Sequence, residues 1–137
     1  EVNNPSKKSR TSLDDLTQRD YGINSTRMKR IFRMFRDANV NFIVTALSKE
    51  ITNDDGKIIE ILPYFTPKVG EALMGYVDYV WYLYVDNTGK RKLLTQPKGP
   101  FRAKTRGFAF ADKLGEQVEN PDLSEIFKLT GATSKKK

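Results

Sequence analysis

Two cations in the C-terminal third of the chain offer the most specific chemistry in the sequence. Lys104 and Arg106 lie in the run Lys-Thr-Arg-Gly, which ends at Gly107. Residues two apart on an extended segment point to the same side, so both cations can reach one phosphorylated ligand. Charge builds on phosphoryl oxygens during phosphoryl transfer, and a cation placed there stabilises it. In a chain with 24 Lys and Arg residues, an ordinary surface triplet is the alternative.

A second group of cations lies along one face of a predicted helix. Four apolar residues follow the spacing i, i+3, i+4 and i+7: Met28, Ile31, Phe32 and Phe35. This spacing predicts a helix over residues 20–38, with Asp20 or Ser25 as its N-cap. The opposite face is basic: Arg27, Lys29, Arg30, Arg33 and Arg36. That face could bind DNA or an acidic neighbouring subunit, and a solvated surface is the alternative.

Further cations are interleaved with Phe101 and Phe108 and form a C-terminal basic cluster. Its members are Arg91, Lys92, Lys98, Arg102, Lys104 and Arg106. Cations and aromatic rings in one stretch can follow a phosphate backbone and stack on bases. A subunit interface or a solvated rim is the more common role of such a cluster. Core packing is favoured over base stacking for three aromatic residues within an apolar stretch: Trp81, Tyr82 and Tyr84.

The chain contains no phosphate-binding loop of the Walker A type. That loop requires G-x-x-x-x-G-K-[ST], in which glycines let backbone N–H groups wrap the phosphates. Gly70 and Gly75 have the spacing, but Tyr76 follows in place of lysine. Gly56 and Gly89 precede lysines within expected hairpin turns. An apolar strand ending in Asp, which a Walker B segment requires, is also missing from the sequence.

Composition excludes several classes of chemistry. The chain has no Cys and no His, which excludes disulfides, thiol catalysis, the usual zinc sites and a Ser-His-Asp relay. Asp54 and Asp55 fit a turn and Asp78 fits strand entry, so we assign no metal ligand. The net charge of +7 permits contact with nucleic acid without establishing it. No apolar run reaches the ~20 residues of a membrane span, so we expect a soluble, intracellular protein without membrane contact.

The remaining pattern predicts one α/β domain over residues 13–131, between a basic tail at 1–12 and a Lys-rich tail at 132–137. Residues 40–47 are β-rich and almost continuously apolar, as in a central parallel strand buried on both faces. Helix followed by buried strand is typical of α/β folds.

A hairpin is predicted over residues 79–85 and 91–96, with a loop of about four residues. An antiparallel hairpin after a parallel-type strand predicts a mixed sheet, with too few strands for a complete doubly wound fold. Shorter elements are also expected: strands over residues 57–62 and 101–105, and helices over residues 67–74 and 122–129.

Several runs occur in the same order as in one known family. They are Asn41-Phe-Ile-Val-Thr-Ala-Leu-Ser-Lys-Glu50, Gly75-Tyr-Val-Asp78, Leu93-Leu-Thr-Gln-Pro97 and Ala103-Lys-Thr-Arg-Gly107. The basic helix after Asp20-Tyr-Gly is similar too. Over residues 18–130 the chain thus resembles the phage nucleotide-binding proteins of RecA-like type, the single-strand annealing and recombination-mediator ATPases.

The resemblance implies the C-terminal half of a RecA-like P-loop NTPase core, an α/β fold with a mixed sheet, a β-hairpin and flanking helices. In such proteins the Walker A and B segments precede this region. Thr45, with Ser48 and Lys49, matches a polar sensor near the γ-phosphate, and a buried threonine bonded to backbone is the alternative. Leu47 departs from the family pattern, because many relatives have His at that position.

The resemblance also gives Lys104 and Arg106 a role. They match the Lys-x-Arg element with which ring-forming relatives reach a neighbouring subunit's γ-phosphate. The implied function is ATP-dependent binding of single-stranded DNA during phage recombination or replication. ATP and Mg²⁺ would serve the full-length parent, with none held by this chain alone.

Expected partners are single-stranded DNA, further copies of the protein, and the missing N-terminal ATPase half or a single-strand-binding protein. The expected location is the cytoplasm, that of the bacterial host for a phage protein. The alternative function is a basic nucleic-acid-binding or protein-interaction module without nucleotide chemistry.

Overall fold

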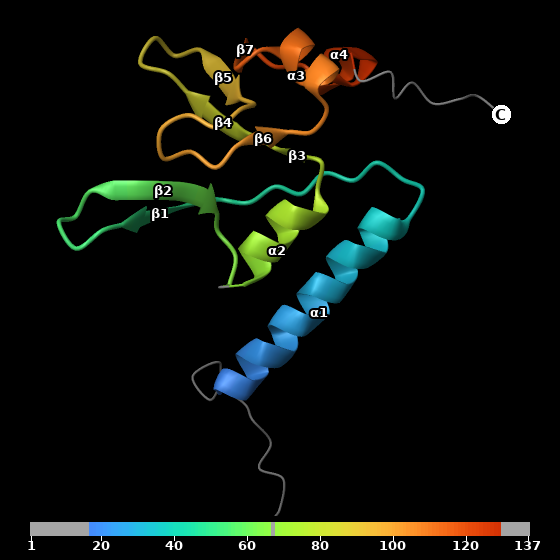
Figure 1. The fold of residues 1–137 in the computed structure, drawn as a ribbon, viewed down its shortest axis with the longest axis vertical. Coiled ribbons are helices and arrows are strands. Elements are labelled where there is room, and N and C mark those ends of the chain that lie inside the picture. The colour runs from blue at the N-terminus through green and yellow to red at the C-terminus, as the bar shows by residue number, and fades with distance from the viewer. Residues whose placement is uncertain (1–16, 67, 130–137) are drawn as a thin grey trace, which may run out of the picture.

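The computed structural model describes residues 17–66 and 68–129 (Figure 1). Within these ranges the chain forms four helices and seven short strands, which confirms the coarse prediction of a fold that mixes helices and strands. Among the described helices, none combines the length and apolarity needed to cross a membrane. The tails predicted at residues 1–12 and 132–137 lie outside the described residues.

The long helix predicted over residues 20–38 is confirmed as α1, Gln18–Asp37. Its start differs from the prediction, because Thr17 is the N-cap residue. The Thr17 amide and hydroxyl donate hydrogen bonds of 2.9 and 2.6 Å to the Asp20 carboxylate. Asp20 is therefore not the N-cap. It is the third residue of α1, and its carboxylate accepts hydrogen bonds from the residue that precedes the helix, as in a capping box. Ser25 lies inside α1, where its hydroxyl is 3.3 Å from that of Thr66.

The apolar face of α1 packs against α2, Val69–Tyr76, which confirms the short helix predicted over residues 67–74. Their shared core contains Phe32, Val69 and Leu73. The ring of Phe65 meets that of Phe32 edge to face at 5.9 Å. Only part of the predicted apolar stripe is covered, because Ile31 and Phe35 each remain 47% exposed.

The buried parallel strand predicted over residues 40–47 does not form. These residues pair with no strand of the described chain and run as an extended trace between α1 and the first hairpin (Figure 1). Four of their apolar side chains are exposed, by 38 to 78%: Val40, Ile43, Val44 and Leu47. The sequence specifies a two-sided apolar strand, and the described residues supply no sheet in which to bury it.

The first hairpin joins β1, Ser48–Thr52, to β2, Ile58–Pro63, through the turn predicted at residues 53–56. Gly56 has φ +76°, a left-handed conformation that suits glycine. β2 also contacts the segment before β6, Lys104–Thr105: the Ile61 amide donates to the Pro100 carbonyl at 2.7 Å.

The strand predicted over residues 79–85 divides at Trp81. β3, Tyr79–Val80, pairs with β6, whereas β4, Tyr82–Val85, pairs with β5, Arg91–Leu94, in the expected hairpin. β7, Gln117–Glu119, adds to the other edge of β5.

All strand pairs in the described chain are antiparallel. The sole parallel pairing among these residues is the isolated bridge between Ile61 and Phe101. The mixed sheet is therefore corrected to three small antiparallel sheets.

Two short helices close the C-terminal part. α4, Leu123–Leu129, was expected, whereas α3, Phe108–Leu114, was not. Gly107 and Gly115 bracket α3 with φ of 93° and 73°. Both helices cover the hairpin through a second core: Leu93, Phe110, Leu114 and Ile126, with Tyr79, Trp81 and Val118 packed against it.

Candidate functional site

Lys104 and Arg106 lie on and just after β6, whose backbone pairs only with β3 within the described chain. The Arg106 amide continues the pairing by donating to the Asp78 carbonyl at 3.1 Å. Because side chains alternate along an extended segment, Thr105 points away from the side shared by Lys104 and Arg106.

The inward side chain of Thr105 anchors this segment. The Trp81 indole N–H donates to the Thr105 hydroxyl at 2.9 Å, and that hydroxyl donates to the Thr95 carbonyl at 2.7 Å. Thr95 is fully buried, and its own hydroxyl donates to the Gly115 carbonyl at 2.6 Å. A chain of satisfied polar groups thus holds the backbone that carries the two cations.

The electrostatic surroundings of the two cations differ. The Arg106 guanidinium is 2.6 Å from the Asp78 carboxylate, and both side chains are more than half exposed. Burial lowers the pKa of Lys104, the nearby Arg106 charge lowers it further, and Asp78 acts in the opposite direction. The effect of the Arg106 charge on the pKa of Lys104 agrees with the position of both side chains on the same side of the strand. The site carries two positive charges and one negative charge.

The predicted sensor residues lie elsewhere. Thr45 is exposed within residues 40–47, which argues against the alternative of a buried threonine bonded to backbone. Its role as a sensor stays a prediction. Ser48 and Lys49 open β1 and are also exposed. In the described residues, no hydrogen bond or ion pair joins these three to Lys104 or Arg106.

The basic face of α1 is largely free of carboxylate partners. In the described chain, Arg36 pairs with the adjacent Asp37 at 2.7 Å, whereas Arg27, Lys29, Arg30 and Arg33 form no ion pair. Arg33 and Arg36 lie over the ring of Tyr76 at 5.9 and 5.3 Å from its centroid. The face therefore keeps most of its positive charge available.

The C-terminal basic cluster is mostly neutralised. Lys92 pairs with Asp86 at 2.9 Å, Lys98 pairs with Glu116 at 2.5 Å, and Arg102 pairs with Glu60. Arg91 is exposed and has no ion pair with a described carboxylate. Phe108 follows Gly107 at the start of α3 and is 94% exposed. These contacts favour a solvated rim for the paired members over a phosphate track.

The four glycines that were compared with a Walker A loop lie in a helix or in hairpin turns. Gly70 lies in the first turn of α2 and Gly75 near its end, so the two glycines belong to one helix and do not form a phosphate-wrapping loop. Gly56 and Gly89 lie in hairpin turns, and the Asp86 carboxylate accepts the Lys90 amide at 3.0 Å.

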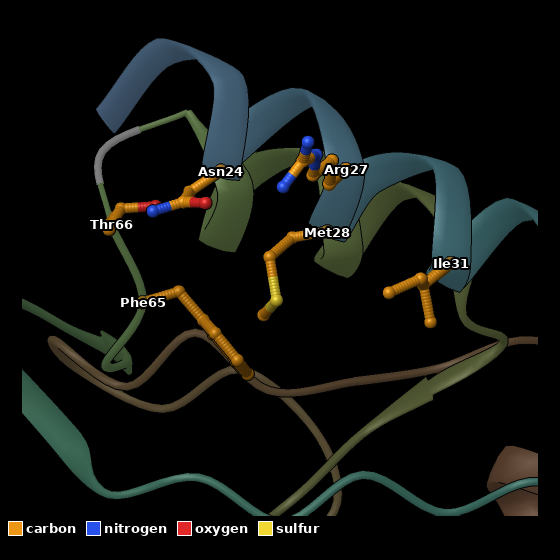
Figure 2. A pocket seen from close by; sticks show the side chains of 6 residues that line it. All are labelled: Asn24, Arg27, Met28, Ile31, Phe65 and Thr66. Atoms are coloured by element: carbon orange, nitrogen blue, oxygen red, sulfur yellow. The ribbon is translucent and has the colours of Figure 1, made fainter. Parts of the chain in front are cut away.

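Sequence reasoning missed a cavity of about 400 Å³ beside α1. Figure 2 shows Met28 and Phe65 on its apolar side and the Asn24 side chain directed toward Thr66, with Arg27 on α1 above Met28. Met28 and Ile31 were assigned to the core stripe, and nothing in their spacing marks them as the wall of an open cavity.

Comparison with known proteins identifies the family. The model of the AAA domain matches residues 1–107, a range that ends with the Lys-Thr-Arg-Gly run. No curated protein and no solved structure matches the chain. The match covers well over half of the chain, which therefore belongs to the AAA domain family of P-loop NTPase-like proteins.

Proposed function

We propose that the chain forms the C-terminal portion of a phage RecA-like ATPase that binds single-stranded DNA in an ATP-dependent way during recombination or replication. The observation that carries the proposal is the placement of Lys104 and Arg106 on one side of an anchored edge segment. The family match, which includes this segment, supports a nucleotide-related function.

In this proposal Lys104 and Arg106 contact the nucleotide of a neighbouring subunit. Asp78 pairs with the Arg106 guanidinium, and an incoming phosphate would compete with Asp78 for it. Cations inserted from a neighbour stabilise charge on the phosphoryl oxygens and make turnover depend on assembly. The exposed ring of Phe108 is the kind of side chain that anchors a subunit contact.

ATP and Mg²⁺ would be held mainly by a phosphate-binding loop outside this sequence, since the 137 residues contain none. Mg²⁺ would neutralise phosphate charge there. The basic face of α1 would contact DNA phosphates, because its cations have few carboxylate partners.

The test uses Lys104→Ala and Arg106→Ala in the natural protein that carries this chain, with Lys57→Ala as the control. Lys57 is an exposed cation of the first hairpin that belongs to no proposed site and has no ion pair among the described residues. We expect DNA-stimulated ATP turnover to fall about 10³-fold or more in the first two variants, with ATP binding retained. Lys57→Ala should turn over normally. Unchanged turnover in Arg106→Ala would remove these residues from the proposed role.

The alternative is a basic nucleic-acid-binding or interaction module without nucleotide chemistry. The unpaired cations of α1 are the observation that favours it. A natural protein that binds single-stranded DNA equally well with and without nucleotide, and that binds no ATP analogue, would establish this alternative.

A further inference from the structure

Asp78 lies between two features that the proposed function treats separately, the basic face of α1 and the cations of β6. It follows the end of α2 by two residues and directly precedes β3. Its carboxylate is 2.6 Å from the Arg106 guanidinium, and its backbone carbonyl accepts the Arg106 amide at 3.1 Å. Asp78 thus joins the end of α2 to one of the two cations assigned to the neighbouring nucleotide.

α2 connects this ion pair to the basic face of α1. The helix contacts α1 and leads through Val77 toward β3 (Figure 1). Tyr76 and Val77 pack against the core that the two helices share. The guanidinium groups of Arg33 and Arg36 lie 5.9 and 5.3 Å from the centroid of the Tyr76 ring. Two cations of the basic face therefore hold the last residue of α2, two positions before Asp78.

The ion pair and the ring contacts are of similar strength. The side chains of Arg106 and Asp78 are both more than half exposed. An exposed ion pair changes an equilibrium by at most about fivefold, and a cation over an aromatic ring at an exposed site contributes by a similar factor. A ligand that displaces Arg33 and Arg36 from the ring can therefore shift the equilibrium of the Asp78 ion pair, because the two contributions are comparable.

We propose that Asp78 is a positioning residue that holds Arg106 away from the neighbouring nucleotide until DNA binds α1. The inference rests on the proposed function and adds regulation to it. In the DNA-free protein, Arg33 and Arg36 fix the end of α2, so that Asp78 retains Arg106. DNA phosphates are stronger partners for these guanidinium groups than the Tyr76 ring is. When DNA binds, the end of α2 loosens and Arg106 is released.

A structural brace is the alternative role of the same ion pair. If Asp78 only supported the active position of Arg106, its loss would lower turnover both with and without DNA. If Asp78 restrains Arg106, its loss raises turnover without DNA and leaves the DNA-bound rate unchanged. The sign of the change therefore separates the two roles.

ATP turnover of the natural protein, measured with and without saturating single-stranded DNA, tests the proposal. We expect Asp78→Asn to raise the DNA-free kcat about two- to fivefold, with the KM for ATP and the DNA-bound kcat unchanged. Asp54→Asn is the matched control, because Asp54 is an exposed carboxylate with no ion pair among the described residues. It should leave both rates unchanged.

Two outcomes separate this inference from the proposed function. A DNA-free kcat that is unchanged or lower in Asp78→Asn, while Arg106→Ala loses turnover, would overturn the inference and leave the proposed function intact. Normal turnover in Arg106→Ala would remove the proposed function, and this inference with it.

Variants of Tyr76 test the route from α1. Tyr76→Leu removes the ring under Arg33 and Arg36, so we expect a similar rise in the DNA-free kcat. Tyr76→Phe keeps a ring for the cations and should behave as the native protein. The double variant Tyr76→Leu/Asp78→Asn should rise no further than Asp78→Asn alone, because both changes release the same ion pair. Rises that multiply in the double variant would overturn the proposal.

Discussion

Burial of apolar groups and pairing of charged groups differ between two parts of the chain. These are the C-terminal part, residues 79–129, and the N-terminal part, residues 17–47. In the C-terminal part, the hairpin and two helices enclose Leu93, Phe110 and Ile126, and Ile126 is 2% exposed. In the N-terminal part, α1 buries Phe32, whereas the segment after it leaves Ile43 60% exposed.

Charges follow the same division. Lys92, Lys98 and Arg106 each have a carboxylate partner, whereas Arg27 and Arg30 on α1 have none in the described chain. The C-terminal part thus has a closed core and mostly paired cations, with Lys104 and Arg106 on and just after the edge strand β6. The N-terminal part has an uncovered apolar surface and an uncompensated basic surface, which suit a polypeptide and a polyanion respectively.

The largest effect on stability is expected from the closed core. Ile126→Ala should lower the free energy of unfolding by about 2–5 kcal/mol, because it removes buried methyl groups and leaves a cavity. Ile43→Ala in the isolated chain should change it by at most about 0.5 kcal/mol, because Ile43 is largely exposed. Denaturant unfolding of the two variants compares the regions directly. Similar losses would mean that residues 40–47 are already packed.

The next effect concerns DNA. Affinity for DNA falls as the salt concentration rises, so the slope of log affinity against log salt concentration is negative. Arg30→Ala should reduce the magnitude of this slope by about one, as expected when a phosphate contact is lost. Lys98→Ala should leave the slope unchanged, because Lys98 is paired with Glu116 at 2.5 Å. Charge reversal at Arg30 and Arg33 together should weaken binding further. Fluorescence titration of a single-stranded oligonucleotide over a range of salt concentrations measures both quantities, and an unchanged slope for Arg30→Ala would make the α1 face a solvated surface.

The smallest effect is a pH dependence within the hairpin. Hydrogen bonds from Thr88, the Lys92 ammonium and nearby amides hold the pKa of Asp86 well below its usual range. A carboxyl group with a lowered folded-state pKa adds stability above its unfolded pKa of about 4 and loses it as the pH falls through the folded value. Asp86→Asn should therefore be less stable than the native chain at pH 7, and the difference should shrink below about pH 4. Urea midpoints between pH 7 and pH 3 measure this, and a constant difference would contradict the assignment.

Local signals in the sequence predicted much of the fold. Helical spacing of Met28 and Phe32 identified α1, and the turn at residues 86–89 identified the second hairpin. α3 is short and flanked by glycines, and β1 is polar, so neither has a strong pattern of its own. The expected burial of residues 40–47 depends on strands that the described residues do not contain.

The candidate site was less predictable. The alternation that places Lys104 and Arg106 on one side follows from the sequence, once an extended segment is assumed. Their surroundings do not, because Asp78 lies 28 residues from Arg106 and Glu60 lies 42 residues from Arg102 along the chain. Neutralisation of the C-terminal basic cluster is therefore a tertiary effect, which the spacing of cations alone cannot reveal.

The central claim is that Arg106 acts on the nucleotide of a neighbouring subunit, and mixing subunits tests it most directly. One preparation carries Arg106→Ala, which keeps its own nucleotide site. The other is a variant of the natural protein that cannot bind nucleotide but retains Arg106. Each should be nearly inactive alone, and the mixture should regain DNA-stimulated ATP turnover, because the second subunit supplies Arg106 to the first. A mixture that stays as inactive as its components, although the subunits assemble together, would contradict the claim.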